Sequence, residues 1–123
     1  MQLDVWMAGW QMECCGTPFR EKSEVSWQLG PATDVEALNV VLQDCGTATI
    51  DAIEDHHGDL STPPTAAIVV SIATVHCRFA PEPVAGSGVV TPVAEAERWN
   101  SDIGDRRFAG FLVRVVTTEP NDE

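Results

Sequence analysis

Residues 66–79 read AAIVVSIATVHCRF and carry the strongest β-strand signal of the chain. They are rich in β-branched and aromatic side chains, which favour extended backbone. The large side chains fall into two groups of opposite parity, namely Ile68, Val70 and Ile72, and then Val75, Cys77 and Phe79. Because consecutive side chains of a strand point to opposite faces, this change of parity predicts a bulge, a sharp bend or a tight turn near residues 71–74.

Weaker strand signals lie on both sides of this stretch. Residues 3–12, LDVWMAGWQM, are apolar at both parities and predict a central strand that is covered on both faces. Gly9 within it predicts a bulge or a close approach of another backbone segment. Alternation of apolar and polar residues predicts a half-buried strand over residues 19–29, which ends at Gly30-Pro31. Further strands are expected at residues 49–55, 89–93 and 108–117.

One segment has helical rather than strand character. Thr33-Asp34-Val35-Glu36 forms a capping box, with a hydroxyl at the N-cap and a carboxylate three residues later. Apolar residues then recur at helical spacing up to Leu42, and Gly46 is a suitable C-cap. These signals predict a helix over residues 33–45. The fold class expected from all segments is mainly β with one helix, arranged as a small barrel-like or strongly bent antiparallel sheet.

The length and the charge of the chain limit what it binds. A chain of 123 residues suits one hydrophobic core, so we expect a single domain over residues 1–123 with a disordered tail at 118–123. The chain has 19 acidic and 7 basic residues, a net charge of −12. That charge repels phosphate backbones and anionic membrane surfaces, so we expect no nucleic-acid or membrane partner. It agrees with a basic protein partner, and also with a merely solvated surface.

The N-terminal residues and the cysteines bear on the compartment. Residues 1–6 lack the basic region, the apolar core and the cleavage site of a secretory signal peptide, and no stretch is apolar enough to span a membrane. We therefore expect a cytoplasmic protein whose thiols stay reduced. The cysteines, Cys14, Cys15, Cys45 and Cys77, are then free thiols or metal ligands rather than disulfides.

Several short motifs are distinctive. They are GWQMECCGTPF at residues 9–19, VSW at 25–27, EDHHG at 54–58, VHC at 75–77 and FAGFLV at 108–113. With these motifs the chain resembles, over residues 5–113, a family of short actinobacterial proteins of unknown function. Such proteins tend to carry a Gly-Asp turn where this chain has Lys22-Ser23. The resemblance implies one compact domain in an actinobacterial cytoplasm, and it implies no activity.

Cysteines and histidines occur in three adjacent pairs, Cys14-Cys15, His56-His57 and His76-Cys77. Both residue types bind zinc, and each pair lies beside a turn or a strand end. This leads to the hypothesis of a structural zinc site held by Cys15, His57 and Cys77, with Cys14 as the fourth ligand and Glu54 or Asp55 orienting the histidine. The spacing matches no zinc finger, and a buried thiol beside loop histidines is the more common interpretation.

Two other function classes remain open beside a non-enzymatic binding or accessory domain, which we favour. A small enzyme would use Cys14 or Cys15 as the nucleophile and His57 as the base, although the acidic surroundings disfavour a thiolate. A metal-free interaction module would recognise a basic partner through the acidic middle of the chain.

Tryptophan is unusually frequent, whereas tyrosine is absent. Trp6 and Trp10 share one face of the predicted first strand, where they would line a ligand groove or a partner surface. The more ordinary interpretation is a core built on tryptophan.

Overall fold

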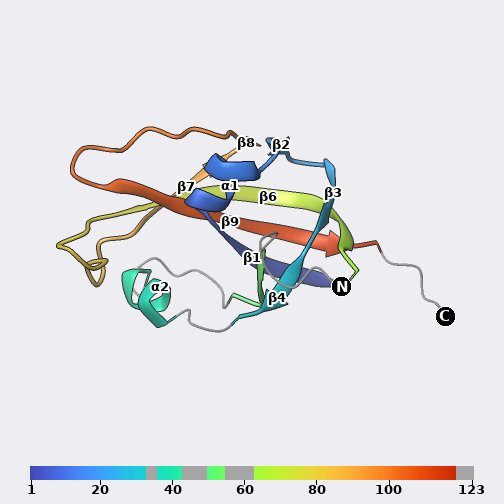
Figure 1. The fold of residues 1–123 in the computed structure, drawn as a ribbon, viewed down its shortest axis with the longest axis horizontal. Coiled ribbons are helices and arrows are strands. Elements are labelled where there is room, and N and C mark those ends of the chain that lie inside the picture. Colours follow the sequence, from blue (N-terminus) through green and yellow to red (C-terminus); the bar gives the residue numbers. More distant parts are fainter. Residues whose placement is uncertain (33–35, 43–49, 55–62, 119–123) are drawn as a thin grey trace.

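Two long strands lie at the centre of the fold, β6 (Thr65–Cys77) and β9 (Arg107–Thr117). They pair antiparallel along most of their length and cross the whole molecule (Figure 1). The computed structural model describes residues 1–32, 36–42, 50–54 and 63–118. The stretch with the strongest sequence signal is therefore also the strand on which the rest of the sheet is built.

The other elements are shorter. In chain order they are β1 (Gln2–Ala8), α1 (Gly9–Cys15), β2 (Phe19–Arg20), β3 (Glu24–Trp27), β4 (Leu29–Pro31), α2 (Glu36–Val41), β5 (Ala52–Glu54), β7 (Val89–Val93) and β8 (Glu95–Ala96). The main sheet has the order β3-β6-β9-β1-β5-β4, with β7 also paired to β6, and β2 and β8 form a separate small pair.

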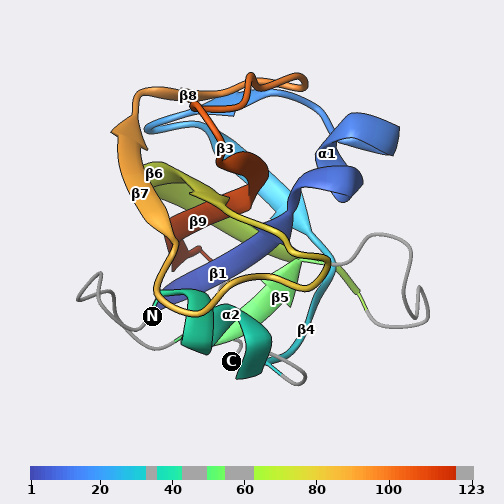
Figure 2. The same ribbon diagram turned by 90° about the vertical axis from the view of Figure 1, so that its left-hand side faces the viewer.

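The main sheet curls strongly into a half-barrel, which confirms the predicted fold class (Figure 2). Among the strand pairs described, β1 and β5 run parallel and the others are antiparallel, so the expected antiparallel sheet contains one parallel pair. The chain passes from β3, at one edge of the sheet, to β4, at the other edge, across the single residue Gln28. This short crossing draws the two edges toward each other.

Residues 66–79 contain a bulge, but it does not cause the change of parity between Ile72 and Val75. The pairing with β9 is regular from Ser71 to Val75, so Ile72 and Val75 lie on opposite faces of β6 and are buried in different clusters. The register passes from Val69 opposite Val115 to Ser71 opposite Arg114, so Val70 is an extra residue on β6. Val69 and Ile72 are buried on either side of it, whereas Val70 is 45% exposed. The expectation that Ile68, Val70 and Ile72 share one face is therefore wrong, because one unpaired residue reverses the parity of those that follow.

Two clusters of buried side chains cover the two faces of the sheet. The first contains Val5 and Met7 of β1, together with side chains from β9 and Met12 of α1. The second lies under α2 and contains Val75 and Cys77, with Trp6 of β1 packed against it. Alternate residues of β1 thus serve opposite clusters, which confirms that this strand is central and apolar on both sides.

The predicted first strand ends four residues early. Residues 9–15 form α1 instead of a strand and a turn, so the fold has a second short helix that the sequence did not predict. Helical winding places both Gln11 and Met12 against the interior, at 4% and 0% exposure. Gly9 does mark a close approach, since a Cβ atom there would lie 2.8 Å from the Phe108 ring.

The helix predicted over residues 33–45 is present as α2, and the capping box at Thr33 and the C-cap at Gly46 lie outside the described residues. The strand predicted over residues 19–29 is divided into β2, β3 and β4. Gly30-Pro31, expected to end that strand, instead continues β4 beside β5. Pairing with β5 is a tertiary contact that local turn propensity does not anticipate.

Lys22 occupies a backbone conformation that suits glycine, with φ of 72°. Its N–H donates to the carbonyl of Val69, 2.8 Å away, which holds the turn between β2 and β3 against the central strand. We expect Lys22→Gly to raise the free energy of unfolding by about 0.5–1 kcal/mol, because a side chain at positive φ is strained. Urea denaturation measures this, with Lys22→Ala as the control, since alanine keeps the Cβ atom. An equal gain with alanine would show that backbone strain is not the cause.

Candidate functional site

A pocket of about 420 Å³ opens between the edge strand β3, strand β5 and the segment that leads into β2. We call it the acidic pocket. Its walls come from segments far apart in the chain, which the curl of the sheet brings together. The residues that line it are Met7, Gly16, Thr17, Pro18, Phe19, Ser23, Glu24, Val25, Ser26, Trp27 and Glu54.

Both charged side chains that line the acidic pocket are carboxylates. Glu54 ends β5 on the same parity as the buried Ala52, and its side chain is only 2% exposed. Glu24 begins β3 and is exposed at the rim. No lysine or arginine is among the residues lining this pocket. Because its charged side chains are all acidic, the pocket has an electrostatic potential that favours a positively charged ligand group.

Aromatic rings form the apolar wall of the acidic pocket. The rings of Phe19 and Trp27 meet edge to face, with centroids 5.1 Å apart. Met7, which is 3% exposed, adds an apolar surface from β1. Aromatic faces attract cations, and a carboxylate accepts several hydrogen bonds at once. The combination suits a ligand group that is positively charged and carries an apolar stem, such as an amine or a guanidinium on a methylene chain.

A second pocket of about 550 Å³ lies on the other side of β2 and shares Pro18, Phe19 and Ser23 with the first. We call it the mixed pocket, because its remaining lining is Arg20, Glu95, Ala96, Glu97, Arg98 and Trp99. Arg20 and Glu95 form an exposed ion pair, which holds the pKa of Arg20 above its usual value through the hydrogen bond and the charge of Glu95. Trp99 is 69% exposed, which leaves a large apolar surface at this pocket.

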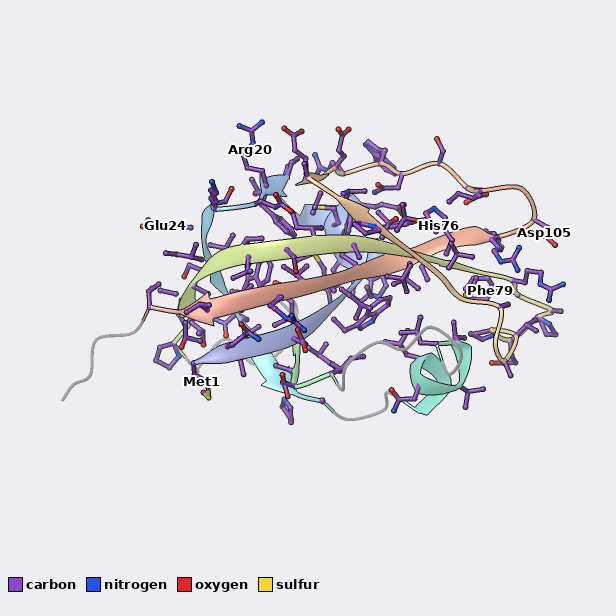
Figure 3. All side chains as sticks on the ribbon, turned by 180° about the vertical axis from the view of Figure 1, so that it is seen from behind. Met1, Arg20, Glu24, His76, Phe79 and Asp105 are labelled. Carbon is purple, nitrogen blue, oxygen red and sulfur yellow. The ribbon has the colours of Figure 1, made fainter. Side chains whose placement is uncertain are left out.

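His76 lies at the opposite end of the molecule from Glu24 (Figure 3). Its Nε2 lies 2.9 Å from the carbonyl oxygen of Ser101, and because a carbonyl only accepts, Nε2 carries the hydrogen and donates. Nδ1 is buried without a hydrogen-bond partner among the described residues. The imidazole thus attaches the segment after β8 to the sheet, and it lies far from the acidic pocket.

The structure places two of the four predicted zinc ligands. Cys14 is exposed at the end of α1, where its carbonyl accepts a hydrogen bond from Arg98 at 3.2 Å. Cys77 is buried, 2% exposed, in the cluster under α2. His57 and the side chain of Cys15 lie outside the described part of the chain. Within the described part, no group of three or more His, Cys, Asp or Glu side chains is placed to hold a metal ion. The zinc site and the alternative Cys–His enzyme remain predictions.

Burial raises the pKa of the Cys77 thiol above its ordinary value of 9.0. The folded chain therefore holds this proton more tightly than the unfolded chain does, so stability is retained below about pH 9 and falls as the pH rises past the unfolded pKa. We expect an alkylating reagent to modify Cys14 quickly and Cys77 only on unfolding, as mass spectrometry of peptides would show. Cys77→Ala should flatten the decline of stability between about pH 8 and 10. Rapid native labelling of Cys77 would contradict its burial.

Trp6 and Trp10 do not share a strand face, because Trp10 belongs to α1. Trp6 is partly buried against the second cluster, whereas Trp10 is 57% exposed. A role for them in ligand binding remains a prediction, and neither lines the two pockets described here. The tryptophans that do line these pockets are Trp27 and Trp99.

The sequence analysis gave Glu54 a role as partner of a metal-bound histidine, and it placed residues 19 and 27 in a half-buried strand without a role in binding. One signal pointed to the pocket: Glu54 stands at a buried parity of the strand predicted over residues 49–55. An acidic residue at a buried position is uncommon, which sets Glu54 apart from the solvated acidic residues of the chain. Nothing in the sequence shows that β3 and β5 face each other across a cavity.

No helix among the described residues has both the length and the apolar character needed to cross a membrane. Neither the curated proteins nor the solved structures contain a match to this sequence. A family model does match, over residues 1–117, and it is described as a family of unknown function, DUF6578. That span covers every strand and both helices of the structure, so the chain belongs to the DUF6578 family of unknown function.

Proposed function

We propose that this protein is a non-enzymatic binding domain whose acidic pocket takes a positively charged side chain of a basic protein partner. The observation that carries the proposal is the lining of the pocket: a carboxylate that is 2% exposed, a second carboxylate at the rim, two aromatic rings and no basic side chain. The net charge of −12 favours the approach of a basic partner over long range.

A binding role is favoured over catalysis by the same residues. The enzyme alternative requires a cysteine nucleophile and a histidine base, and the residues that line the pocket include neither. A reducing, cytoplasmic setting is part of the proposal.

The test is a titration with Nα-acetyl-lysine amide, followed by NMR, with the norleucine analogue as its uncharged counterpart. The lysine compound is expected to shift the resonances of Trp27 and its neighbours, whereas the norleucine compound is not. Glu54→Gln should weaken binding about tenfold or more, because a hydrogen bond to a charged group is worth about 1.5–3 kcal/mol.

Glu21→Gln is the matched control, since Glu21 is exposed and lines neither pocket. It removes the same charge from the chain, so any long-range effect of net charge is the same in both variants. Thermal unfolding of each variant confirms that it is folded. Equal binding of the lysine and norleucine compounds, or equal loss in the two variants, would rule out recognition of a cation by Glu54.

A further inference from the structure

The acidic pocket runs along the whole of β3. Residues 24, 25, 26 and 27 all line it, together with Ser23 immediately before them. Consecutive side chains of a strand point to opposite faces, so a cavity on one face would touch only alternate residues. A pocket lined by four residues in succession must therefore lie against the edge of the strand, where the backbone itself is accessible.

β3 is the terminal strand of the main sheet and pairs only with β6 among the described strands. The N–H of Val69 on β6 donates to the carbonyl of Ser23, 2.9 Å away. In an antiparallel pair the backbone groups of alternate residues point toward the partner strand. Those of Val25 and Trp27 thus point to β6, and those of Glu24 and Ser26 point to the free edge. An edge of this kind is a template for another strand.

The charge of the chain indicates which kind of strand pairs with the free edge of β3. A second copy of this chain, at −12, would bring a second Glu24 and the same excess of acid to the edge, so pairing between copies is disfavoured. A basic segment meets Glu24 at the rim and Glu54 in the pocket instead. The mixed pocket continues past Pro18 and Phe19 and presents Trp99, a residue type that often anchors bound peptides.

We propose that the ligand is an extended peptide that adds to the free edge of β3 as a strand, with a basic side chain in the acidic pocket and a large apolar side chain against Trp99. This inference rests on the proposed binding of a cation by the acidic pocket and adds the backbone as the second element of recognition. Main-chain hydrogen bonds supply affinity in such complexes, and the pockets for alternate side chains supply specificity.

The probe is the peptide acetyl-Thr-Val-Lys-Val-Thr-amide, titrated by calorimetry or NMR at low salt. It is expected to bind at least tenfold more tightly than Nα-acetyl-lysine amide. Two further versions carry N-methyl groups on alternate residues of opposite parity. In an added strand, only the N–H groups of alternate peptide residues face β3. Strand addition therefore predicts that the version methylated on those residues does not bind and that the other version binds like the unmethylated peptide. Equal behaviour of the two versions would overturn the proposal.

The protein offers a matched pair of variants at the edge. Ser26→Pro removes the N–H at the free edge, a position where proline is compatible with an edge strand, and it should abolish the advantage of the peptide over lysine amide. Ser26→Ala keeps the N–H and should retain the advantage of the peptide over lysine amide, because any effect of the lost hydroxyl on the pocket is shared by the two probes. A longer probe with a phenylalanine after the second valine tests the mixed pocket. We expect this phenylalanine to increase the affinity for the parent protein, and we expect Trp99→Ala to remove that increase.

These outcomes separate this inference from the proposed function. If lysine amide binds and the peptide gains nothing, the pocket recognises a cation without strand addition. If neither probe binds, the proposed function itself fails. Sedimentation of the protein without peptide tests whether a second copy of the chain occupies the edge of β3. A dimer that dissociates in the Ser26→Pro variant would show that it does, and this result would overturn the peptide proposal.

Discussion

Phe111→Ala is expected to lower the free energy of unfolding by about 4 kcal/mol, within the usual range for removing a fully buried phenylalanine. Phe111 lies in the middle of β9 and is 0% exposed. Its ring meets Phe108 at a centroid distance of 5.1 Å and Phe19 at 6.3 Å, both edge to face. Truncation leaves a cavity beneath these rings, and the lost contacts add to the lost hydrophobic burial.

The same substitution bears on the site, because Phe19 lines both pockets and rests on Phe111. Urea denaturation measures the loss of stability, and lysine amide titration of the folded fraction measures the effect on the pocket. If Phe111→Ala does not fold, Phe111→Leu replaces it, because leucine leaves a smaller cavity and the expected loss of unfolding free energy is smaller. Phe79→Ala is the control, since Phe79 is 39% exposed, and about 1 kcal/mol is expected there. Equal losses at the two positions would contradict the central place of Phe111.

Gly110→Ala is expected to cost about 3 kcal/mol, at the upper end for overpacking a closely packed interior. A Cβ atom at this position would lie 2.5 Å from the carbonyl oxygen of Met7 and 2.6 Å from the Trp6 ring. The oxygen belongs to the backbone of β1, the neighbouring strand, and cannot move without disturbing the pairing of β1 with β9. Replacing Trp6 by a smaller side chain should therefore not restore the stability of the Gly110→Ala variant.

Glycine at position 30 provides the comparison for this prediction. Gly30 also lies in a strand, yet the nearest atom to an added Cβ would be 4.0 Å away, so Gly30→Ala should change stability by less than about 0.5 kcal/mol. Thermal and urea unfolding of both variants, and of Gly110→Ala combined with Trp6→Leu, would check the argument. Full recovery in the double variant would mean that the indole, rather than the Met7 carbonyl, makes the close contact.

The strands were predictable where apolar residues recur at alternate positions over several residues. The ends of β6, β7 and β9 lie within two residues of the segments expected from sequence. A bulge does occur at Val70, just before the residues 71–74 where the change of parity predicts one. That change arises instead because Ile72 and Val75 are buried on opposite faces of the sheet. Helix α1 was missed, because GWQMECC has apolar side chains at spacings that suit a strand and a helix equally.

The candidate site shows the same division. The acidic composition agreed with a basic partner and equally with a solvated surface, so the sequence left these two interpretations open. The zinc hypothesis joined three segments that are distant in sequence, without knowledge of their arrangement in space. In the structure, Cys77 is buried in the cluster under α2, whereas Met12 of α1, the helix that carries Cys14, is buried in the other cluster. Metal ligands from separate segments can be joined only when the strand order is known.

The sequence by itself determined that this is a small, acidic, mainly β protein whose longest strand contains residues 66–77, since hydrophobic parity and β-branching act locally. The tertiary structure alone decided that β3 ends the sheet, that β5 pairs parallel to β1, and that Glu54 faces the pocket beside Trp27. Those relations depend on which distant segments pair. Pairing is decided by the summed packing of the whole sheet, which no short stretch of residues encodes.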